Sequence, residues 1–270
     1  MLKTEKKHIG HGTRSMKEQR QEELLDFINS KPYTSYAEIA ERFAGTSLMT
    51  LRRDVESLAK EGKTVRVRGG VKAINYVMRS ADATFYERSQ VNREAKERIA
   101  RAALGLVEPG RTYYFDSGTT VFRMAELMDD VRCWVYTSGL TTATALLKNS
   151  DTRVSIVGGL VSPDNITSSG EDAIRTVSGV SFDTAFIVPS GVVAPDGFSC
   201  GNYHFAELKR AAAKRSKLTV LLADDGKIGA PFPFHLFDFA EVDILITSCR
   251  NLPREVRRCC ASAGVEIITV

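Results

Sequence analysis

The chain has 270 residues, of which 43% are hydrophobic, and its formal net charge is +4. This length is enough for a small domain together with a larger one. No apolar run is long enough to cross a membrane and no signal-peptide core follows the start, so we expect a soluble, cytoplasmic protein. The five cysteines show no metal-ligand spacing, and we expect reduced thiols with neither a metal nor a cofactor.

Positive charge is concentrated in the N-terminal part of the chain. Residues 1–80 contain 16 Lys and Arg against 10 Asp and Glu, a net charge of +6. Residues 81–270 contain 21 against 23, a net charge of −2. An anionic partner is therefore expected for the first part only.

Two helices are predicted in the first 45 residues. Residues 1–14 are polar and without periodicity, and we expect a disordered lead. Apolar spacing predicts a helix over residues 17–29, at the start of a domain that spans residues 15–71. The stretch SYAE, with its glutamate three residues after Ser35, is a capping box and opens a short second helix.

A third helix is predicted over residues 48–61, between an N-cap at Ser47 and a stop at Gly62. Its inner stripe is predicted to consist of Leu51, Val55 and Leu58. A hairpin, or wing, follows in KTVRVRGGV, where valines alternate and two glycines make the turn. This order of elements, two helices, a turn, a third helix and a wing, is that of a winged helix-turn-helix. The helix after the turn enters the major groove of DNA in such domains.

Two adjacent arginines lie in the first two turns of this third helix, where the helix dipole disfavours cations. DNA phosphates and guanine edges are suitable partners, because arginine binds both in a forked geometry. Arg52 is expected on a phosphate or paired with Glu56, and a structural three-helix unit with solvated arginines is the alternative. The predicted DNA-binding residues are Ser47, Thr50, Arg52, Arg53, Arg66 and Arg68.

The stretch SLMTLRRDVESLAKEGKTVRVRGGV resembles the N-terminal signature of the DeoR family of bacterial sugar-responsive repressors. In that family a serine, the pattern Thr-apolar-Arg-Arg-Asp-apolar, a glycine and a basic wing ending in Gly-Gly recur at this spacing. The matching residues are Ser47, Thr50, Arg52, Arg53, Asp54, Leu58, Gly62, Arg68, Gly69 and Gly70. One departure is Arg68, where the family usually has histidine. The resemblance implies a DNA-binding repressor of carbohydrate or nucleoside catabolism genes, and not an enzyme.

Residues 72–85 carry little pattern and are predicted to link this domain to a larger one over residues 86–270. A helix is predicted in NREAKERIARAALGLV, and short apolar strands then alternate with helical stretches. The strands are TYYF, CWVY, VSIV, TAFIV, LTVLLA, VDILIT and VEIIT. This alternation predicts a C-terminal α/β domain with a largely parallel sheet covered by helices.

Three polar loops that contain glycine follow the first three of these strands. In YYFDSGTT, Gly118 permits a tight turn, so that hydroxyls and free N–H groups face one point at a helix N-terminus, as in a phosphate cradle. The stretches YTSGL and IVGGL likewise place a loop that contains glycine after each of the next two strands. Loops at the carboxyl ends of parallel strands are expected to line one ligand crevice. Helix capping alone is the alternative explanation of such loops.

The larger domain also resembles the DeoR family, from about Phe85 to Ser248. The matching stretches are FYER, Lys96, EPGRTYYFDSGTT, the glycines at 158–159, Gly170, FDTAFI, Gly191, ELKR and ADDGK. The resemblance implies a fold like that of ribose-5-phosphate isomerase and the binding of phosphorylated sugars. The effector-binding candidates that it implies are Asp116, Ser117, Gly118, Thr119, Thr120, Thr137, Gly158, Glu207 and Lys227.

Two departures from the family pattern bear on the ligand. The chain has Thr137-Ser138 where the family commonly has Thr-Asn. It has Asp224-Asp225-Gly226-Lys227 where the family commonly has Asp-Ser-Ser-Lys. Lys227 would complete the anion site as a point charge. Asp225 adds a carboxylate near this site. The net charge around the ligand, and therefore the identity of the ligand, stays open.

Three functions remain open from the sequence. The first is a repressor that binds operator DNA as a dimer or tetramer and responds to a phosphorylated sugar, in a direction that the sequence does not determine. The second is a sugar-phosphate isomerase with an appended domain, in which Glu207, Asp116 and Lys227 would supply the acid–base groups. The third is a DNA-binding protein whose larger domain only oligomerises. The basic helix-turn-helix and wing, which an isomerase would not need, favour the first.

Overall fold

The computed structural model describes residues 15–80 and 83–270, apart from the side chains at positions 75, 78 and 79. The predicted lead over residues 1–14 lies outside the described residues. The chain forms two compact units, Met1–Ile74 and Asn75–Val270. Each unit is described by itself below.

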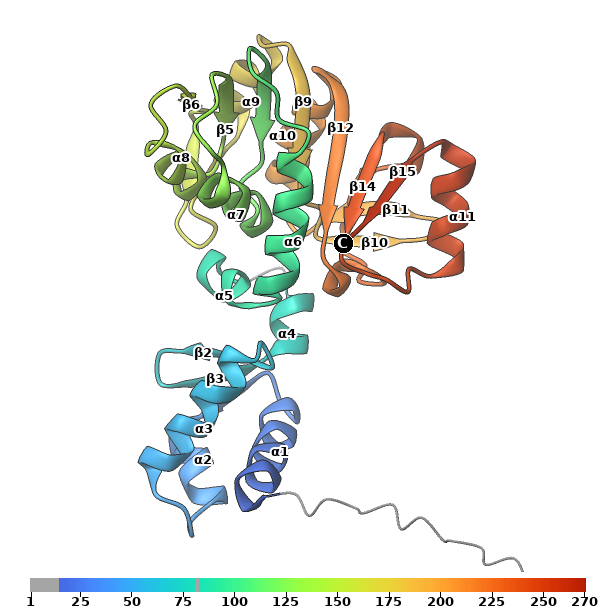
Figure 1. Cartoon of the computed structure of the whole chain (residues 1–270). Helices are drawn as coiled ribbons and strands as arrows, with labels where there is room; N and C mark the ends of the chain where they lie inside the picture. The colour runs from blue at the N-terminus through green and yellow to red at the C-terminus, as the bar shows by residue number, and fades with distance from the viewer. Residues whose placement is uncertain (1–14, 81–82) are drawn as a thin grey trace, which may run out of the picture. The chain divides into compact units, whose positions relative to one another are not determined.

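The N-terminal unit is a winged helix-turn-helix, as predicted (Figure 1, blue). A short strand that was not predicted pairs with the wing and completes a three-stranded antiparallel sheet in the order β1-β3-β2. Three residues are too few to show an alternating pattern in the sequence. The elements are α1 (Met16–Asn29), β1 (Tyr33–Ser35), α2 (Tyr36–Arg42), α3 (Leu48–Lys60), β2 (Thr64–Val67) and β3 (Gly70–Ala73).

Side-chain caps set the starts of α2 and α3. Ser35 forms the predicted capping box with Glu38. Ser47 accepts a hydrogen bond from the N–H of Thr50 at the start of α3. Each cap satisfies a backbone N–H that has no partner inside its helix. The predicted stop of α3 is confirmed, because Gly62 follows the helix with φ +72°.

The core of the N-terminal unit is formed by the inner sides of its three helices. Its most buried members are Leu24 and Ile28 of α1, Ile39 of α2, and Leu51, Val55 and Leu58 of α3. The inner stripe predicted for α3 is therefore confirmed. The opposite side of this helix is left for solvent or for a partner.

A buried carboxylate joins α3 to α1. Asp54 is 2% exposed and accepts hydrogen bonds from Arg20 Nε at 2.6 Å and from Gln21 Nε2 at 3.0 Å. The hydrogen bond from Arg20 to Asp54 raises the pKa of that guanidinium. Because a buried carboxylate needs such partners, this contact orients α1 against α3 and balances the charge of Asp54 inside the unit.

The range 72–85, which was assigned to a linker, contains regular structure. Strand β3 runs through Ala73, and α4 (Ile74–Arg79) begins at the next residue. Helix α5 (Phe85–Gln90) begins at the end of the range. Both helices have six residues, which is too short for helical periodicity to be visible in the sequence.

A seven-stranded parallel sheet forms the centre of the C-terminal unit (Figure 1). Its order is β15-β14-β12-β9-β4-β5-β6, and all neighbouring strands are parallel. The seven predicted apolar runs are these seven strands, to within about two residues at each end. They are β4 (Thr112–Phe115), β5 (Trp134–Thr137), β6 (Arg153–Ile156), β9 (Phe182–Ile187), β12 (Ser216–Ala223), β14 (Ile244–Thr247) and β15 (Glu266–Thr269).

Helices cover both faces of this sheet. One face packs against α6 (Arg93–Leu104), α7 (Thr119–Leu127) and α8 (Leu140–Leu146). The other face packs against α9 (Glu171–Ser178), α10 (Tyr203–Lys214) and α11 (Arg254–Ala263). Successive strand residues alternate between the two cores, so Tyr113 lies on the first side and Tyr114 on the second. Burial on both faces explains why the strands are continuous apolar runs.

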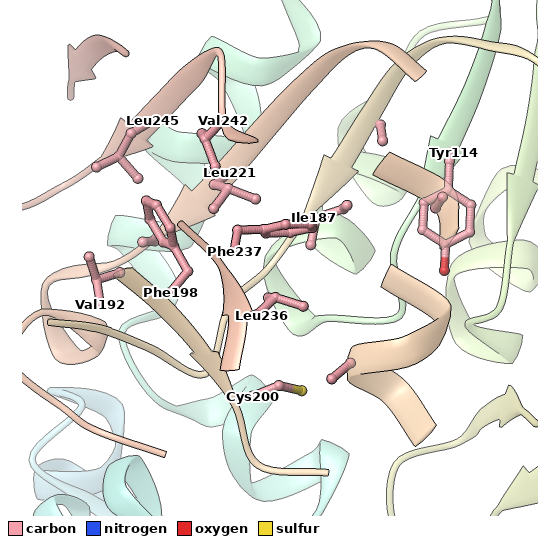
Figure 2. Close-up of a cluster of buried hydrophobic side chains, with 14 of the residues drawn as sticks. Tyr114, Ile187, Val192, Phe198, Cys200, Leu221, Leu236, Phe237, Val242 and Leu245 are labelled. Atoms are coloured by element: carbon pink, nitrogen blue, oxygen red, sulfur yellow. The ribbon is translucent and has the colours of Figure 1, made fainter. Parts of the chain in front are cut away.

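Short strands that were not predicted add to this framework. A small antiparallel sheet in the order β10-β11-β13 packs on the second face. Figure 2 shows Val192, Phe198 and Phe237 of this small sheet grouped with Leu221 and Ile187 of the main sheet. The additional strands are β7 (Leu160–Ser162), β8 (Thr167–Ser169), β10 (Gly191–Val193), β11 (Gly197–Cys200) and β13 (Phe234–Phe237).

The strand order places the topological switch point between β4 and β9. From β4 the chain continues to β5 and β6 on one side of the sheet. It then returns to the other side of β4 with β9, β12, β14 and β15. In open α/β sheets, ligands bind beyond the carboxyl ends of the strands at such a point.

The described residues contain no helix with the length and apolar character needed to span a membrane. All five cysteines are free thiols in the structure. Three of them are buried, and Cys249 and Cys259 are partly exposed.

We expect Asp54→Ala to lower the free energy of unfolding of the N-terminal unit by about 1.5–3 kcal/mol, because a hydrogen bond between charged groups is lost. Calorimetric unfolding of the full chain measures this as a shift of the transition of the smaller unit. Asp26→Ala, at an exposed carboxylate of α1, is the matched control and should change the free energy by less than about 0.5 kcal/mol. Equal shifts in the two variants would contradict a stabilising role of Asp54.

Candidate functional site

The exposed side of α3 carries the predicted DNA-binding residues of that helix. Met49 is 62% exposed, and Arg53, one turn later, is exposed beside it and opposite the buried stripe. The hydroxyls of Ser47 and Thr50 lie 2.9 Å apart at the start of the helix. The structure therefore brings a serine, a threonine and an arginine together in the exposed N-terminal half of α3.

Arg52 differs from Arg53 in having an aromatic partner. Its guanidinium lies over the ring of Tyr36, 5.3 Å from the ring centroid. Glu56, the alternative partner considered from the sequence, forms an ion pair with Lys60 at 3.3 Å. A stacked guanidinium uses its face, so its in-plane N–H groups remain available to donate to a phosphate.

The wing holds Arg66 and Arg68 in exposed positions. Arg66 lies on β2, and Arg68 lies in the turn that leads to β3. A Cβ at Gly70 would lie 2.4 Å from the carbonyl oxygen of Thr34, so glycine is needed there for β3 to approach β1. Gly69 has φ +83°, which also favours glycine. The two glycines thus build the turn that presents the wing arginines.

A buried ion pair lies at the switch point of the C-terminal unit. Asp116 follows β4, is 1% exposed and accepts a hydrogen bond from the Val188 N–H at 3.0 Å. Lys209 of α10 lies 3.0 Å from Asp116 and donates to the carbonyl oxygen of Val188 at 2.6 Å. Burial acts to lower the pKa of Lys209, but the charge of Asp116 raises it overall, so the ammonium is retained. These contacts join β4, β9 and α10.

The loop after β4 leads directly into α7, as predicted. Gly118 is the N-cap residue, and a Cβ there would lie 2.6 Å from the side chain of Val188. Because glycine offers no side chain as a cap, the first N–H groups of α7 are available to an anion. The buried hydroxyl of Thr120 has no hydrogen-bond partner within the described residues. This loop therefore has donors that the protein itself does not satisfy.

A pocket of about 100 Å³ opens beside the loop. Arg88, Lys209 and Lys227 line it, and none of the described lining residues is a carboxylate. Lys209 is paired with Asp116, whereas Arg88 and Lys227 form no ion pair within the described part of the chain. A pocket of this size and charge fits a small anion. The other lining residues are Val77, Ser80, Ser117, Gly118, Thr119, Thr120, Asn165, Val188, Pro189, Ser190, Cys200, Gly201, Asn202, Phe205 and Phe232.

Burial lowers the pKa of both Arg88 and Lys227. For Arg88, burial is the largest effect and the charge of Asp116 opposes it. For Lys227, burial again dominates, Asp224 opposes it, and repulsion from Arg88 and Lys209 adds to it. Cations that repel one another in a poorly solvated pocket are stabilised by a bound anion.

A smaller cavity of about 20 Å³ shares Val77, Arg88 and Lys227 with this pocket. Lys96 of α6 lines the smaller cavity, is 5% exposed and donates to the carbonyl oxygen of Arg88. Burial lowers the pKa of Lys96 to about 7, although Asp224 acts in the opposite direction. Lys96 is thus a cation whose charge changes near neutral pH.

The two aspartates of ADDGK have different environments. Asp224 is 3% exposed and accepts hydrogen bonds from the Gly226 N–H at 3.0 Å and from Asn92 Nδ2 at 2.9 Å. Asp225, the residue that departs from the family pattern, is exposed and accepts a hydrogen bond from Ser248 at 3.2 Å. It lines neither cavity, so its carboxylate does not alter the balance of charges on the pocket wall.

Four of the nine predicted effector residues do not line the pocket, and one of these, Asp116, is paired with the lining residue Lys209. Thr137 ends β5 and is fully buried, and its hydroxyl accepts a hydrogen bond from the Gly139 N–H. Gly158 follows β6, the edge strand, two strands away from β4. Glu207 lies two residues before Lys209, and so on the opposite side of α10, where it pairs with Arg210. The loop after β4 is therefore the only one of the three predicted loops whose described residues line this pocket.

The remaining predicted effector residues gather at the pocket, together with residues that the sequence analysis did not select. Lys209 was detectable, because Ala206, Lys209 and Ala212 follow the spacing of the buried side of α10. Arg88 gave no signal, since a helix of six residues shows no period. Asn165, Ser190 and Asn202 lie outside the main-sheet strands and the helices, where side-chain direction does not follow from a pattern.

Comparison with known proteins places both units in one family. Residues 91–249 match the DeoR C terminal sensor domain, and residues 20–77 match the DeoR-like helix-turn-helix domain. The HTH-type transcriptional regulator GolR of Listeria innocua is 30% identical over 85% of this chain and 89% of its own length. The glycerol-3-phosphate regulon repressor of Escherichia coli is 26% identical over 85% of this chain and 90% of its own length. A ribose 5-phosphate isomerase from Methanocaldococcus jannaschii covers 51% of this chain and 55% of its own, at 13% identity and a TM-score of 0.38.

The two family matches correspond to the structural features described above. The sensor-domain match contains the central sheet as far as β14 and spans more than half of the chain. The helix-turn-helix match contains α2, α3 and the wing. The chain belongs to the DeoR family of helix-turn-helix transcriptional regulators.

Proposed function

We propose that this protein represses genes of carbohydrate or nucleoside catabolism and leaves its operator when a phosphorylated sugar binds in the C-terminal unit. The observation that carries the proposal is the positively charged pocket at the switch point, which is lined by Arg88, Lys227 and the uncapped start of α7. A phosphate monoester carries a charge of roughly −1.5 to −2 and three acceptor oxygens, which suits two cations and several donors. One relative is named for a glycerol-3-phosphate regulon, and glycerol 3-phosphate is such a monoester.

Operator binding is proposed for α3 and the wing. Ser47, Thr50 and Arg53 would lie nearest the base edges, because they share the exposed N-terminal half of α3. Arg52, held over Tyr36, and the wing arginines would contact the DNA backbone. Regulators with one reading helix usually bind two half-sites as dimers, so we propose that the protein self-associates as a dimer or tetramer.

The pocket supports ligand binding better than isomerase activity. Aldose–ketose isomerisation needs a general base close to the substrate. Neither Asp116 nor Glu207 lines the pocket: Asp116 is buried and binds Lys209 and Val188 through Oδ2, and Glu207 pairs with Arg210. A coupled assay with ribose 5-phosphate tests this point, and turnover by the purified protein would contradict the proposal.

A gel shift tests the whole proposal. The DNA is the region upstream of the chain's own gene and of neighbouring sugar-catabolism genes, and the additions are a panel of sugar phosphates. Specific binding that one compound abolishes would support the repressor and identify its effector. Binding that no compound changes, together with no thermal shift by any of them, would favour a DNA-binding protein without an effector.

Lys227→Ala should raise the sugar-phosphate concentration needed for release from DNA by about tenfold or more, because a charge-assisted contact is lost. DNA affinity without ligand should stay unchanged. Lys217→Ala is the matched control, since Lys217 lies at the other end of β12 and pairs with Asp183 at 2.9 Å. A Lys227 variant that responds at the wild-type concentration would remove this residue from the effector site.

Arg53→Ala should cost roughly 1–3 kcal/mol in specific operator binding, because the arginine is proposed to read a base. Arg52→Ala, at the neighbouring position, should weaken specific and non-specific binding alike and lower the salt dependence. Fluorescence anisotropy on operator and scrambled DNA at several salt concentrations separates the two roles. Unchanged operator affinity of the Arg53 variant would exclude a base contact.

Affinity for a phosphate monoester should fall between pH 7 and pH 9. Lys96 has a pKa of about 7, so it is about half protonated at pH 7 and neutral at pH 9, and positive charge beside the pocket is lost. The second pKa of the phosphate is about 6, so the ligand stays close to a dianion over this range. Titration calorimetry measures the trend, and Lys96→Met should flatten it. Constant or rising affinity in the wild-type protein would contradict this assignment.

A further inference from the structure

We propose that α4 and α5 form a wall of the effector pocket through which ligand binding acts on the DNA-binding unit, with Arg88 as the ligand contact on that wall. This inference rests on the proposed function, because it assigns the regulation of the same pocket. Val77, Ser80 and Arg88 are the described lining residues that precede the sheet in the chain. The other lining residues follow β4.

The wall is continuous in sequence with the wing. Strand β3 ends at Ala73, and α4 begins at Ile74 without an intervening loop residue. Val77, in the middle of α4, is 1% exposed and lines both cavities. A change in the position of this wall therefore reaches the wing through a stretch of only a few residues.

Arg88 is placed to hold an anion from this wall. Its guanidinium donates to the carbonyl oxygen of Ala83, which uses part of its five donors. Its own carbonyl oxygen accepts from Lys96, which fixes the end of α5 against α6. The guanidinium shares the pocket with Lys227, and the two cations repel each other. An anion between them would bring the wall and the sheet loops together.

A backbone contact gives the wall a second connection to the pocket. The Phe85 N–H, at the start of α5, donates to the carbonyl oxygen of Asp164 at 2.7 Å. The next residue, Asn165, lines the pocket. Ile166 follows with φ +50°, a conformation that is rare for β-branched residues and recurs at ligand clamps and switches. A ligand that binds Asn165 therefore acts on α5 through a single peptide unit.

Only contacts that differ between two conformations allow a ligand to shift their populations. The donors of the loop after β4 and Lys227 belong to the sheet side of the pocket and can hold a ligand equally well in both conformations. Contacts from α4 and α5 change whenever this wall moves relative to the sheet. Arg88 should therefore contribute to coupling as well as to affinity, whereas Lys227 should contribute mainly to affinity.

Hydrogen exchange of the full chain, measured by mass spectrometry, tests this assignment. The probe is whichever of ribose 5-phosphate, glycerol 3-phosphate and inorganic phosphate binds most tightly in titration calorimetry. In the wild-type protein, the saturating probe should slow exchange in peptides over residues 116–121 and also over residues 74–91. Arg88→Gln should weaken binding on the order of tenfold. At saturation it should keep the protection over 116–121 and lose that over 74–91.

Control variants separate the assignment from damage to the fold. Arg98→Gln, at an exposed arginine of α6, should behave as the wild-type protein. Arg88→Lys keeps the positive charge and should give intermediate protection, and it replaces Arg88→Gln if that variant does not fold. Protection confined to residues 116–121 in the wild-type protein would overturn the inference and leave the proposed function intact. No binding of any of the three probes would overturn both.

Discussion

The ion pair between Asp116 and Lys209 is the contact on which the pocket depends. A buried pair of charges is costly unless hydrogen bonds satisfy it, and the peptide groups of Val188 supply an N–H for Oδ2 of the carboxylate and a carbonyl oxygen for the ammonium, while Oδ1 of Asp116 has no partner within the described residues. Because the three residues come from β4, α10 and the end of β9, one interaction positions three walls. It also balances the charge of Lys209, so Arg88 and Lys227 determine the sign of the pocket.

The N-terminal unit uses a buried carboxylate in a similar way. Asp54 is held by Arg20 of α1, so it does not neutralise the exposed Arg53 beside it on α3. In each unit, a buried carboxylate pairs with one cation, while other cations are exposed on α3 or line the pocket. Net charge does not reveal this division, since residues 81–270 carry a net −2 and nevertheless form a positive pocket. A count of charges along the sequence does not show which charges are paired in the structure.

The sequence predicts which segments form strands, but it does not predict which strands are adjacent in the sheet. Continuous apolar runs identify strands buried on both faces, which is why all seven strands of the main sheet were predicted. Their order depends on pairing between distant segments, such as β4 with β9, which no local pattern encodes. The loops after β5 and β6 were therefore expected to share a crevice with the loop after β4. The loop after β5 does pack against Ser117 of that loop but does not line the pocket, whereas Val188, at the end of the other neighbouring strand, does.

Helix periodicity decides which polar side chains of α10 face the sheet. Lys209 shares the spacing of the buried alanines and Glu207 does not, so the buried side of a helix should be identified before a functional residue is chosen on it. The place of Arg88 in the pocket could not be predicted from helix periodicity, because it depends on contacts between α5 and residues far along the chain. The pocket cations come from α5, α10 and the turn after β12, and an anion among them would relieve their repulsion. The binding free energy of such an anion is then available to move α5 relative to the sheet, which a site built on the sheet loops alone could not achieve.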